Sequence, residues 1–203
     1  MKDKKKLIKE INSWIFSILG GFLIAVLLNS KVFAKVQVQQ SSMENTLFAN
    51  QQLIIDKLSY NFAEPKRGDI VIFLEDREKG TILEDALSTV HSMVLIFSNN
   101  KDYNEENKRL VKRVIGVTGD EIDIKDGYVY VNGEKLQEPY AKGETFSGEF
   151  KLPIKVGENE LFVLGDNRQV SKDSRKFGLI NFKQVEGKAI FRVYPFNDIG
   201  EIK

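Results

Sequence analysis

The chain has 203 residues, enough for one medium domain with an anchor or for two small domains. Its 30 basic and 29 acidic side chains nearly cancel, so charge does not indicate a nucleic-acid partner. Because there is no cysteine, disulfides, thiolate nucleophiles and cysteine zinc sites are excluded. The single histidine, His91, lies at the edge of an apolar run, where we expect a structural role.

The N-terminus joins a basic tail, residues 1–10, to a stretch without charged side chains, residues 11–28. A membrane-spanning helix needs about 20 residues, so the sequence predicts a transmembrane anchor over residues 11–31. The lysines before the anchor predict a cytoplasmic N-terminus and a single pass through the cell membrane, with residues 35–203 outside. A cleavable signal peptide ending near Val32–Ala34 is the alternative that this pattern allows.

Beyond the anchor, short segments rich in β-branched and aromatic residues recur, several of them separated by turn residues. Strands are predicted at residues 52–58, 69–74, 90–97, 110–117, 121–124, 128–131, 160–164 and 188–194. One short helix is predicted at residues 79–89. Two strongly polar stretches, residues 75–80 and 98–108, flank the segment that contains it and are typical of surface loops or of an insertion over residues 75–108. We therefore expect a mainly β catalytic domain of several small antiparallel sheets over residues 35–203.

A pair of serines, Ser41 and Ser42, lies in a polar turn soon after the predicted anchor. Such serines are usually turn formers, but a serine hydroxyl becomes a nucleophile when a base removes its proton. Since the only histidine is not a dependable base, the base has to be a lysine or a carboxylate, and serine–lysine pairs are a known variant of the catalytic triad. Lys112 lies in an apolar, strand-like run. It either protects a strand edge or is buried, and burial lowers the pKa of a lysine.

The densest group of polar residues is Gly165–Gly178. Taken alone, it could be a charged surface loop closed by Asx turns, with Asp173 and Arg175 as an exposed ion pair.

These three stretches, in this order behind an apolar N-terminal segment, resemble the type I signal peptidases. The pattern Gly-x-Ser-Met-x-Pro-Thr-Leu is matched at Ser42, Met43, Thr46 and Leu47. Gln40 and Asn45 replace its glycine and proline. The pattern Lys-Arg-x-x-Gly-x-x-Gly-Asp begins at Lys112, and Gly-Asp-Asn-Arg-x-x-Ser-x-Asp-Ser-Arg-x-x-Gly is matched at every fixed position of Gly165–Gly178.

The resemblance implies a membrane-anchored serine endopeptidase that removes signal peptides from secreted preproteins. It implies Ser42 as nucleophile and Lys112 as general base, with an oxyanion hole formed by the Ser42 N–H and position 40, here Gln40. It also implies Ser171 as a hydrogen-bond partner of the lysine amine. Ion pairs would fix the loop beside the site through Asp166, Asp173 and Arg175.

The implied partners are signal peptides and the lipid bilayer. No metal or organic cofactor is implied. The sequence does not indicate the substrate-binding residues or the oligomeric state.

Two other classes share part of this pattern. A repressor-type serine–lysine autoprotease has the same residue pair and a β-rich fold, but the chain has no helix-turn-helix region. A non-enzymatic or dedicated assembly factor for surface proteins is left open by the departures at Gln40 and Asn45, because function has to be argued from the site rather than from the fold.

Overall fold

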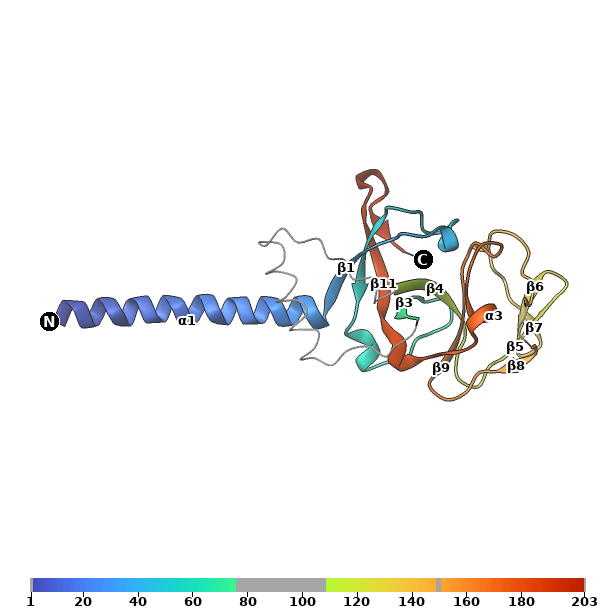
Figure 1. Ribbon diagram of the computed structural model, residues 1–203, viewed down its shortest axis with the longest axis horizontal. Coiled ribbons are helices and arrows are strands. Elements are labelled where there is room, and N and C mark those ends of the chain that lie inside the picture. The colour runs from blue at the N-terminus through green and yellow to red at the C-terminus, as the bar shows by residue number, and fades with distance from the viewer. Residues whose placement is uncertain (1, 76–108, 149–150, 203) are drawn as a thin grey trace. The chain divides into compact units, whose positions relative to one another are not determined.

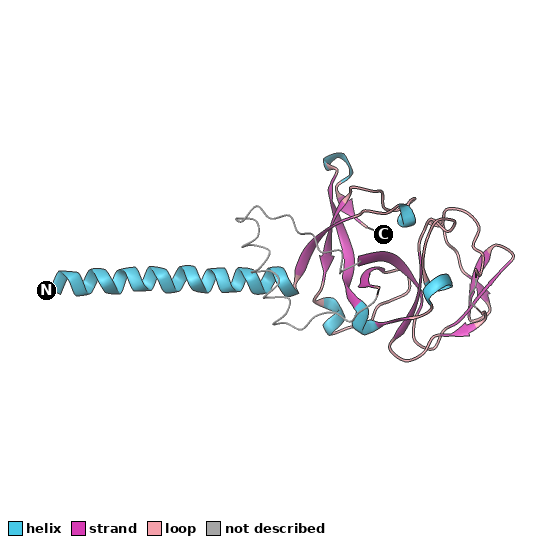
Figure 2. Cartoon of the chain, in the orientation of Figure 1, coloured by secondary structure: helices cyan, strands magenta, loops and turns pink. Residues whose placement is uncertain are grey.

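The computed structural model describes residues 2–75, 109–148 and 151–202. The chain divides into two compact units, of which the first contains helix α1 (Lys2–Lys31) and the second contains the β-rich body (Figures 1 and 2). The apolar side chains of α1 that are described, from Ile11 to Ile24, are exposed. Among the described residues, no helix is long and apolar enough to cross a membrane. The anchor predicted for residues 11–31 is therefore not confirmed.

The larger sheet has eight strands among the described residues. These are β1 (Phe33–Gln37), β2 (Gln52–Asp56), β3 (Ile70–Leu74), β4 (Arg109–Gly116), β9 (Glu160–Leu164), β10 (Ile180–Asn181), β11 (Val185–Tyr194) and β12 (Gly200–Glu201). Their order is β1-β2-β11-β3-β4-β9-β10, and β12 pairs with β11.

The smaller sheet has the order β7-β6-β5-β8. Its strands are β5 (Glu121–Lys125), β6 (Tyr128–Val131), β7 (Glu134–Lys135) and β8 (Ile154–Lys155). The short helices are η1 (Ser41–Met43), η2 (Ser59–Asn61), α3 (Ser174–Phe177), η3 (Phe182–Gln184) and η4 (Phe196–Asp198). The smaller sheet packs against the β4–β9 part of the larger one through a shared apolar cluster that includes Ile115, Ile122, Val131 and Phe162.

Strands β3 and β4 lie at the centre of the larger sheet, paired antiparallel with Val71 opposite Lys112. Every residue of β3 is buried, as are the last five of β4. Because both faces of β3 are covered, its sequence, Ile70–Leu74, is a continuous apolar run rather than a polar–apolar alternation. The two charged side chains in the buried part of β4, Lys112 and Arg113, are therefore held inside the protein, whereas Arg109 at the start of the strand is exposed.

The predicted β class is confirmed, and strands occur wherever the structure describes a segment predicted as one. Strand β6 has the predicted bounds, whereas β11 begins three residues before the predicted strand at residue 188. The sequence does not predict β7, β8, β10 and β12, because two residues carry too little alternation to be recognised, and it does not predict the five-residue strand β1. The strand predicted at 90–97, the helix predicted at 79–89 and His91 lie outside the described residues.

Candidate active site

Ser42 lies in η1, in a turn that two buried apolar side chains fix to the core. Met43 and Leu47 flank the turn and pack against the buried side chains of β2. The Leu47 N–H donates to the Met43 carbonyl at 2.8 Å, and the Asn167 N–H donates to the Ser42 carbonyl at 3.0 Å. Ser42 itself is 7% exposed. Its backbone is therefore held both by the turn and by the loop that follows β9.

Lys112 reaches Ser42 from the centre of the larger sheet. Its side chain is 1% exposed, and its Nζ lies 2.7 Å from the Ser42 Oγ. The same amine donates to the carbonyl of Val111 at 3.0 Å. Two residues far apart in the sequence are thus in direct hydrogen-bond contact, with the geometry that proton transfer between a hydroxyl and an amine requires.

Ser171 and Gly165 lie beside this pair. The Ser171 hydroxyl is buried and has no hydrogen-bond partner among the described residues. A side chain at Gly165 would place its Cβ within 2.5 Å of the Ser42 carbonyl oxygen and closer still to the Ser171 hydroxyl. Only glycine fits between the two serines. The structure therefore brings Ser171 next to the Ser42 backbone, while its predicted hydrogen bond to the lysine amine is absent.

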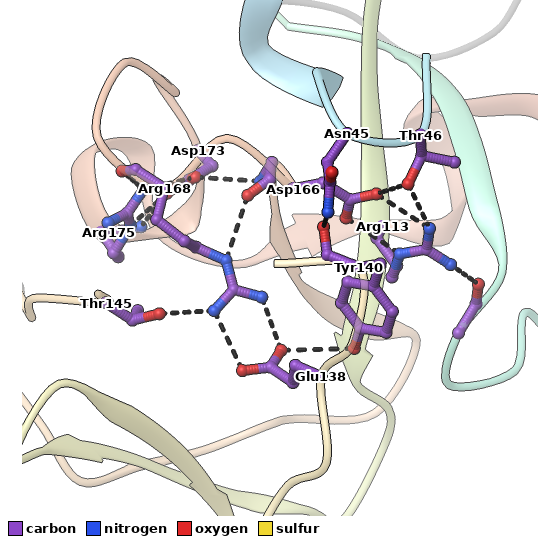
Figure 3. A network of polar contacts seen from close by, with 12 residues as sticks. Asn45, Thr46, Arg113, Glu138, Tyr140, Thr145, Asp166, Arg168, Asp173 and Arg175 are labelled. Atoms are coloured by element: carbon purple, nitrogen blue, oxygen red, sulfur yellow. Dashed lines mark hydrogen bonds and ion pairs between the residues drawn. The ribbon is translucent and has the colours of Figure 1, made fainter. Parts of the chain in front are cut away.

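Arg113, the neighbour of Lys112, enters a buried ion pair with Asp166 (Figure 3). Its Nε and Nη2 donate to the two carboxylate oxygens of Asp166 at 2.9 and 2.8 Å. Thr46 joins the pair, since its hydroxyl donates to Asp166 at 2.5 Å and accepts from Arg113 at 3.2 Å. The network ties together the nucleophile turn, β4 and the loop after β9.

Asp173 and Arg175 form a second buried ion pair, at the start of α3. The Asp173 carboxylate accepts from Arg175 Nε and Nη2, both at 2.8 Å, and from the Gly165 N–H at 3.0 Å. Arg175 also donates to the Arg168 carbonyl at 2.8 Å. These contacts hold Gly165 in place, and with it the backbone beside Ser42.

A third set of polar contacts, which the sequence did not predict, joins the segment around Tyr140 to the loop that follows β9 (Figure 3). Arg168 donates to the two carboxylate oxygens of Glu138 at 3.0 and 2.5 Å. The Tyr140 ring lies 3.9 Å from the Arg113 guanidinium carbon, and burial raises the pKa of Tyr140. The only signal in the sequence patterns was Arg168 in the Gly165–Gly178 match, which does not indicate a partner.

The two positions that depart from the family pattern differ in conformation. Gln40 precedes η1 with φ −117° and ψ 156°, an extended conformation open to any residue, and its side chain is exposed without capping the helix. Asn45 has φ 100°, in the left-handed region, and donates from Nδ2 to the Tyr140 carbonyl at 2.9 Å. The glycine of the pattern is therefore not required by φ at position 40, whereas the proline is excluded by φ at position 45.

No group of three or more histidine, aspartate or glutamate side chains among the described residues is arranged to hold a metal ion.

Comparison with known proteins shows relatives along nearly the whole chain. A family model described as "Signal peptidase, peptidase S26" matches residues 11–194. The chain is 35% identical over 196 residues to signal peptidase I of Bacillus licheniformis, covering 92% of this chain and 90% of that protein. It is 32% identical over 206 residues to signal peptidase IB of Staphylococcus aureus strain COL, covering 94% and 93%.

A crystal structure of a signal peptidase I from Enterococcus faecalis V583 is 28% identical in sequence, with a TM-score of 0.42. The match covers 62% of this chain and 97% of that chain. The sequence comparisons define the class of the protein, which is that of the peptidases. Within that class, the chain belongs to the signal peptidase family, peptidase S26.

Proposed function

We propose that this protein is a serine endopeptidase that removes signal peptides from translocated preproteins, with Ser42 as nucleophile and Lys112 as general base. The observation that carries the proposal is the 2.7 Å contact between the Lys112 amine and the Ser42 hydroxyl. Membership of the signal peptidase family supports the substrate class. We expect cleavage after small residues at the first and third positions before the bond.

The chemistry begins with a neutral amine. Burial disfavours the charged form of a lysine, and the Lys112 side chain is 1% exposed. Neutral Lys112 takes the proton of Ser42 as the hydroxyl oxygen attacks the scissile carbonyl carbon. The tetrahedral intermediate collapses to an ester on Ser42, and the leaving amine takes the proton from Lys112.

Deacylation reuses the same amine. Lys112 accepts a proton from water, which attacks the ester carbonyl, and the proton then returns to the Ser42 oxygen as the acid product leaves. In both steps the oxyanion needs hydrogen-bond donors about 3 Å away. We assign one donor to the Ser42 N–H and place the other at Gln40.

The supporting residues have separate roles in this proposal. Ser171, whose buried hydroxyl lies next to Gly165, orients the lysine amine during the reaction. The ion pairs of Asp166 with Arg113 and of Asp173 with Arg175 keep the backbone around Ser42 in place.

Residues 11–31 are proposed to anchor the enzyme in the membrane, with the N-terminus in the cytoplasm. Support comes from the uncharged run of residues 11–28 and from the exposure of the described apolar side chains of α1. An anchor would confine the enzyme and its membrane-held substrate to one surface, raising their effective concentration. Protease added to intact spheroplasts should digest residues 35–203. Protection of that domain, while an outer-surface control is digested, would refute this topology.

The activity itself is tested with the full chain in detergent and a peptide containing an Ala-x-Ala cleavage site. Wild type and Ser41→Ala should cleave the peptide, whereas Ser42→Ala should not. Ser41 is the matched control because it adjoins Ser42 in η1 but is exposed. Absence of cleavage by folded wild type, on this peptide and on a panel of preproteins, would favour the non-enzymatic assembly factor.

A further inference from the structure

Asn45 lies in the turn next to Ser42, at a position where the backbone angle φ has to be positive. The Thr46 N–H donates to the Met43 carbonyl at 3.0 Å, which closes a four-residue turn. Glu44 has φ −57° and ψ 140°, and Asn45 has φ 100°. These angles are those of a type II turn, whose third residue must have a positive φ and is therefore glycine or asparagine.

The Asn45 side chain uses this conformation to reach another segment. Its Nδ2 donates to the Tyr140 carbonyl at 2.9 Å (Figure 3). The next residues along that segment pair with the loop after β9, since the Lys142 N–H donates to the Asp166 carbonyl at 2.7 Å and the Lys142 carbonyl accepts from Arg168 at 3.0 Å.

The same segment also touches the buried ion pair, because the Tyr140 ring lies 3.9 Å from the Arg113 guanidinium carbon. Thr46, directly after Asn45, contacts Arg113 and Asp166. The nucleophile turn is therefore fixed on one side by Thr46 and on the other by the amide of Asn45. Ser42 directly precedes this turn, so a shift of the turn would move the Ser42 hydroxyl relative to the Lys112 amine.

We infer that Asn45 is a positioning residue for the serine–lysine reaction, acting through its left-handed backbone and its hydrogen bond to Tyr140. The inference rests on the proposed function, because it concerns the placement of Ser42. It has a specific consequence for the family pattern. Restoring the proline of that pattern at position 45 should impair this enzyme, since proline fixes φ near −65° and cannot adopt the observed φ of 100°.

Three substitutions separate the two parts of this role. Asn45→Gly keeps the positive φ without strain and removes the side-chain donor. Asn45→Asp keeps the shape but sets a carboxylate oxygen against the Tyr140 carbonyl, so two acceptors face each other. Asn45→Pro forbids the turn. We expect losses of about threefold to tenfold for Asn45→Gly, more for Asn45→Asp, and about tenfold to 100-fold for Asn45→Pro.

The quantity to measure is the single-turnover rate constant of peptide cleavage, with the full chain in detergent and in saturating excess over the peptide. This rate constant does not depend on the fraction of enzyme that is folded, so a purely structural defect leaves it unchanged. Thermal unfolding is followed in parallel. Asn45→Gly should have a lower rate constant than wild type with an equal or higher unfolding temperature, because glycine relieves the backbone strain.

Asn159 provides the matched control. It also has a positive φ, of 58°, and is exposed, and its carbonyl accepts from the Phe182 N–H rather than from the site. Asn159→Gly and Asn159→Pro should change stability and leave the single-turnover rate constant at the wild-type value.

Each outcome decides the inference. Rate constants within twofold of wild type for Asn45→Gly and Asn45→Asp would overturn it, as would equal losses in the Asn159 variants. If Asn45→Pro does not fold, the glycine and aspartate variants still decide. A wild type that fails to cleave would refute the proposed function instead, so the two failures are distinguishable.

Discussion

Lys112 and Arg113 are neighbours on β4 and are equally well buried, yet their surroundings differ. Strand alternation sends their side chains to opposite faces. The contacts of Arg113 include hydrogen bonds to Asp166, Thr46 and the Gly68 carbonyl, and its guanidinium stacks on Tyr140. On the Lys112 face, the amine contacts the Ser42 hydroxyl, and the Ser171 hydroxyl nearby has no hydrogen-bond partner among the described residues.

This difference distinguishes buried side chains that stabilise the fold from buried side chains that take part in the reaction. A buried polar group that only stabilises a fold has its hydrogen bonds satisfied, because an unsatisfied one is costly. Groups that exchange protons or meet a substrate need unoccupied hydrogen-bonding capacity. Substitutions on the Arg113 face should therefore change stability, and those on the Lys112 face should change activity.

The largest effect is expected for Lys112→Arg. Arginine keeps the charge of lysine but does not lose its proton in a protein, so Ser42 would have no base. Activity should fall by at least about 10⁴-fold, with an unchanged circular dichroism spectrum. Lys188→Arg is the control, because Lys188 is partly exposed and pairs with Asp69. Substantial cleavage by folded Lys112→Arg would rule out the serine–lysine mechanism.

Gly165→Ala tests how closely the two serines are packed. The new Cβ would lie within 2.5 Å of the Ser42 carbonyl oxygen, so the nucleophile turn must shift. We expect activity to fall about 100-fold and the free energy of unfolding to fall by about 1–3 kcal/mol. Gly200→Ala is the matched control, since nothing lies within 4 Å of a Cβ there. Wild-type activity in Gly165→Ala would show that this contact does not position Ser42.

Asp166→Asn tests the Arg113 face. The substitution leaves a buried guanidinium without its counter-charge, which costs about 3–5 kcal/mol of unfolding free energy. Glu186→Gln, which breaks an ion pair with the 46%-exposed side chain of Arg109, should cost about 0–1 kcal/mol. Both values come from urea unfolding followed by circular dichroism. Equal costs would contradict the argument that burial makes the Asp166 pair important.

Ser171 and Ser174 allow the two kinds of buried hydroxyl to be compared within one loop. The Ser174 hydroxyl accepts from the Val163 N–H at 2.9 Å, so Ser174→Ala should cost about 1–3 kcal/mol of stability and leave activity unchanged. Ser171→Ala removes no hydrogen bond to any residue that the structure describes and should cost less than about 0.5 kcal/mol, while activity falls at least tenfold. Peptide cleavage and urea unfolding of both variants provide the measurements, and the reverse pattern would contradict the division of roles.

Strong local patterns made most of the fold predictable. The continuous apolar runs of β3 and β9 and the turn residues around β6 define their strands without tertiary information. Two-residue strands such as β7 exist only because a neighbour pairs with them, so no local pattern reveals them.

The candidate site was predictable in a different way. The family resemblance selected Ser42 and Lys112, but the residues alone did not indicate their contact. Asp166 was expected to form an ion pair, yet its partner Arg113 depends on the pairing of β4 with β9, which brings Arg113 opposite Leu164. Long-range side-chain pairs of this kind follow from sheet order and register, which a single sequence does not specify. The left-handed conformation of Asn45 could not be predicted either, because it depends on the type of turn that the backbone forms.

The last prediction concerns stability alone and expects a small effect at Asp120. Its ion-pair partner Arg67 has a side chain that is 39% exposed. Burial alone would raise the pKa of the Asp120 carboxyl, but hydrogen bonds from the Val117 N–H, Arg67 and Asn132 together lower it below its ordinary value. A lowered pKa in the folded state means that the carboxylate stabilises the protein above its unfolded-state pKa of about 3.9. That stabilisation is lost as the pH falls from this value through the folded-state pKa.

Asp120→Asn should therefore cost less than about 1 kcal/mol at neutral pH, and its difference from wild type should shrink as the pH is lowered below about 4. Urea unfolding of both proteins between neutral pH and about pH 3 measures this. A difference that stays constant over the range would show that the carboxylate charge is not what stabilises the fold. A cost as large as that of Asp166→Asn would show that burial of the partner arginine does not separate the two ion pairs.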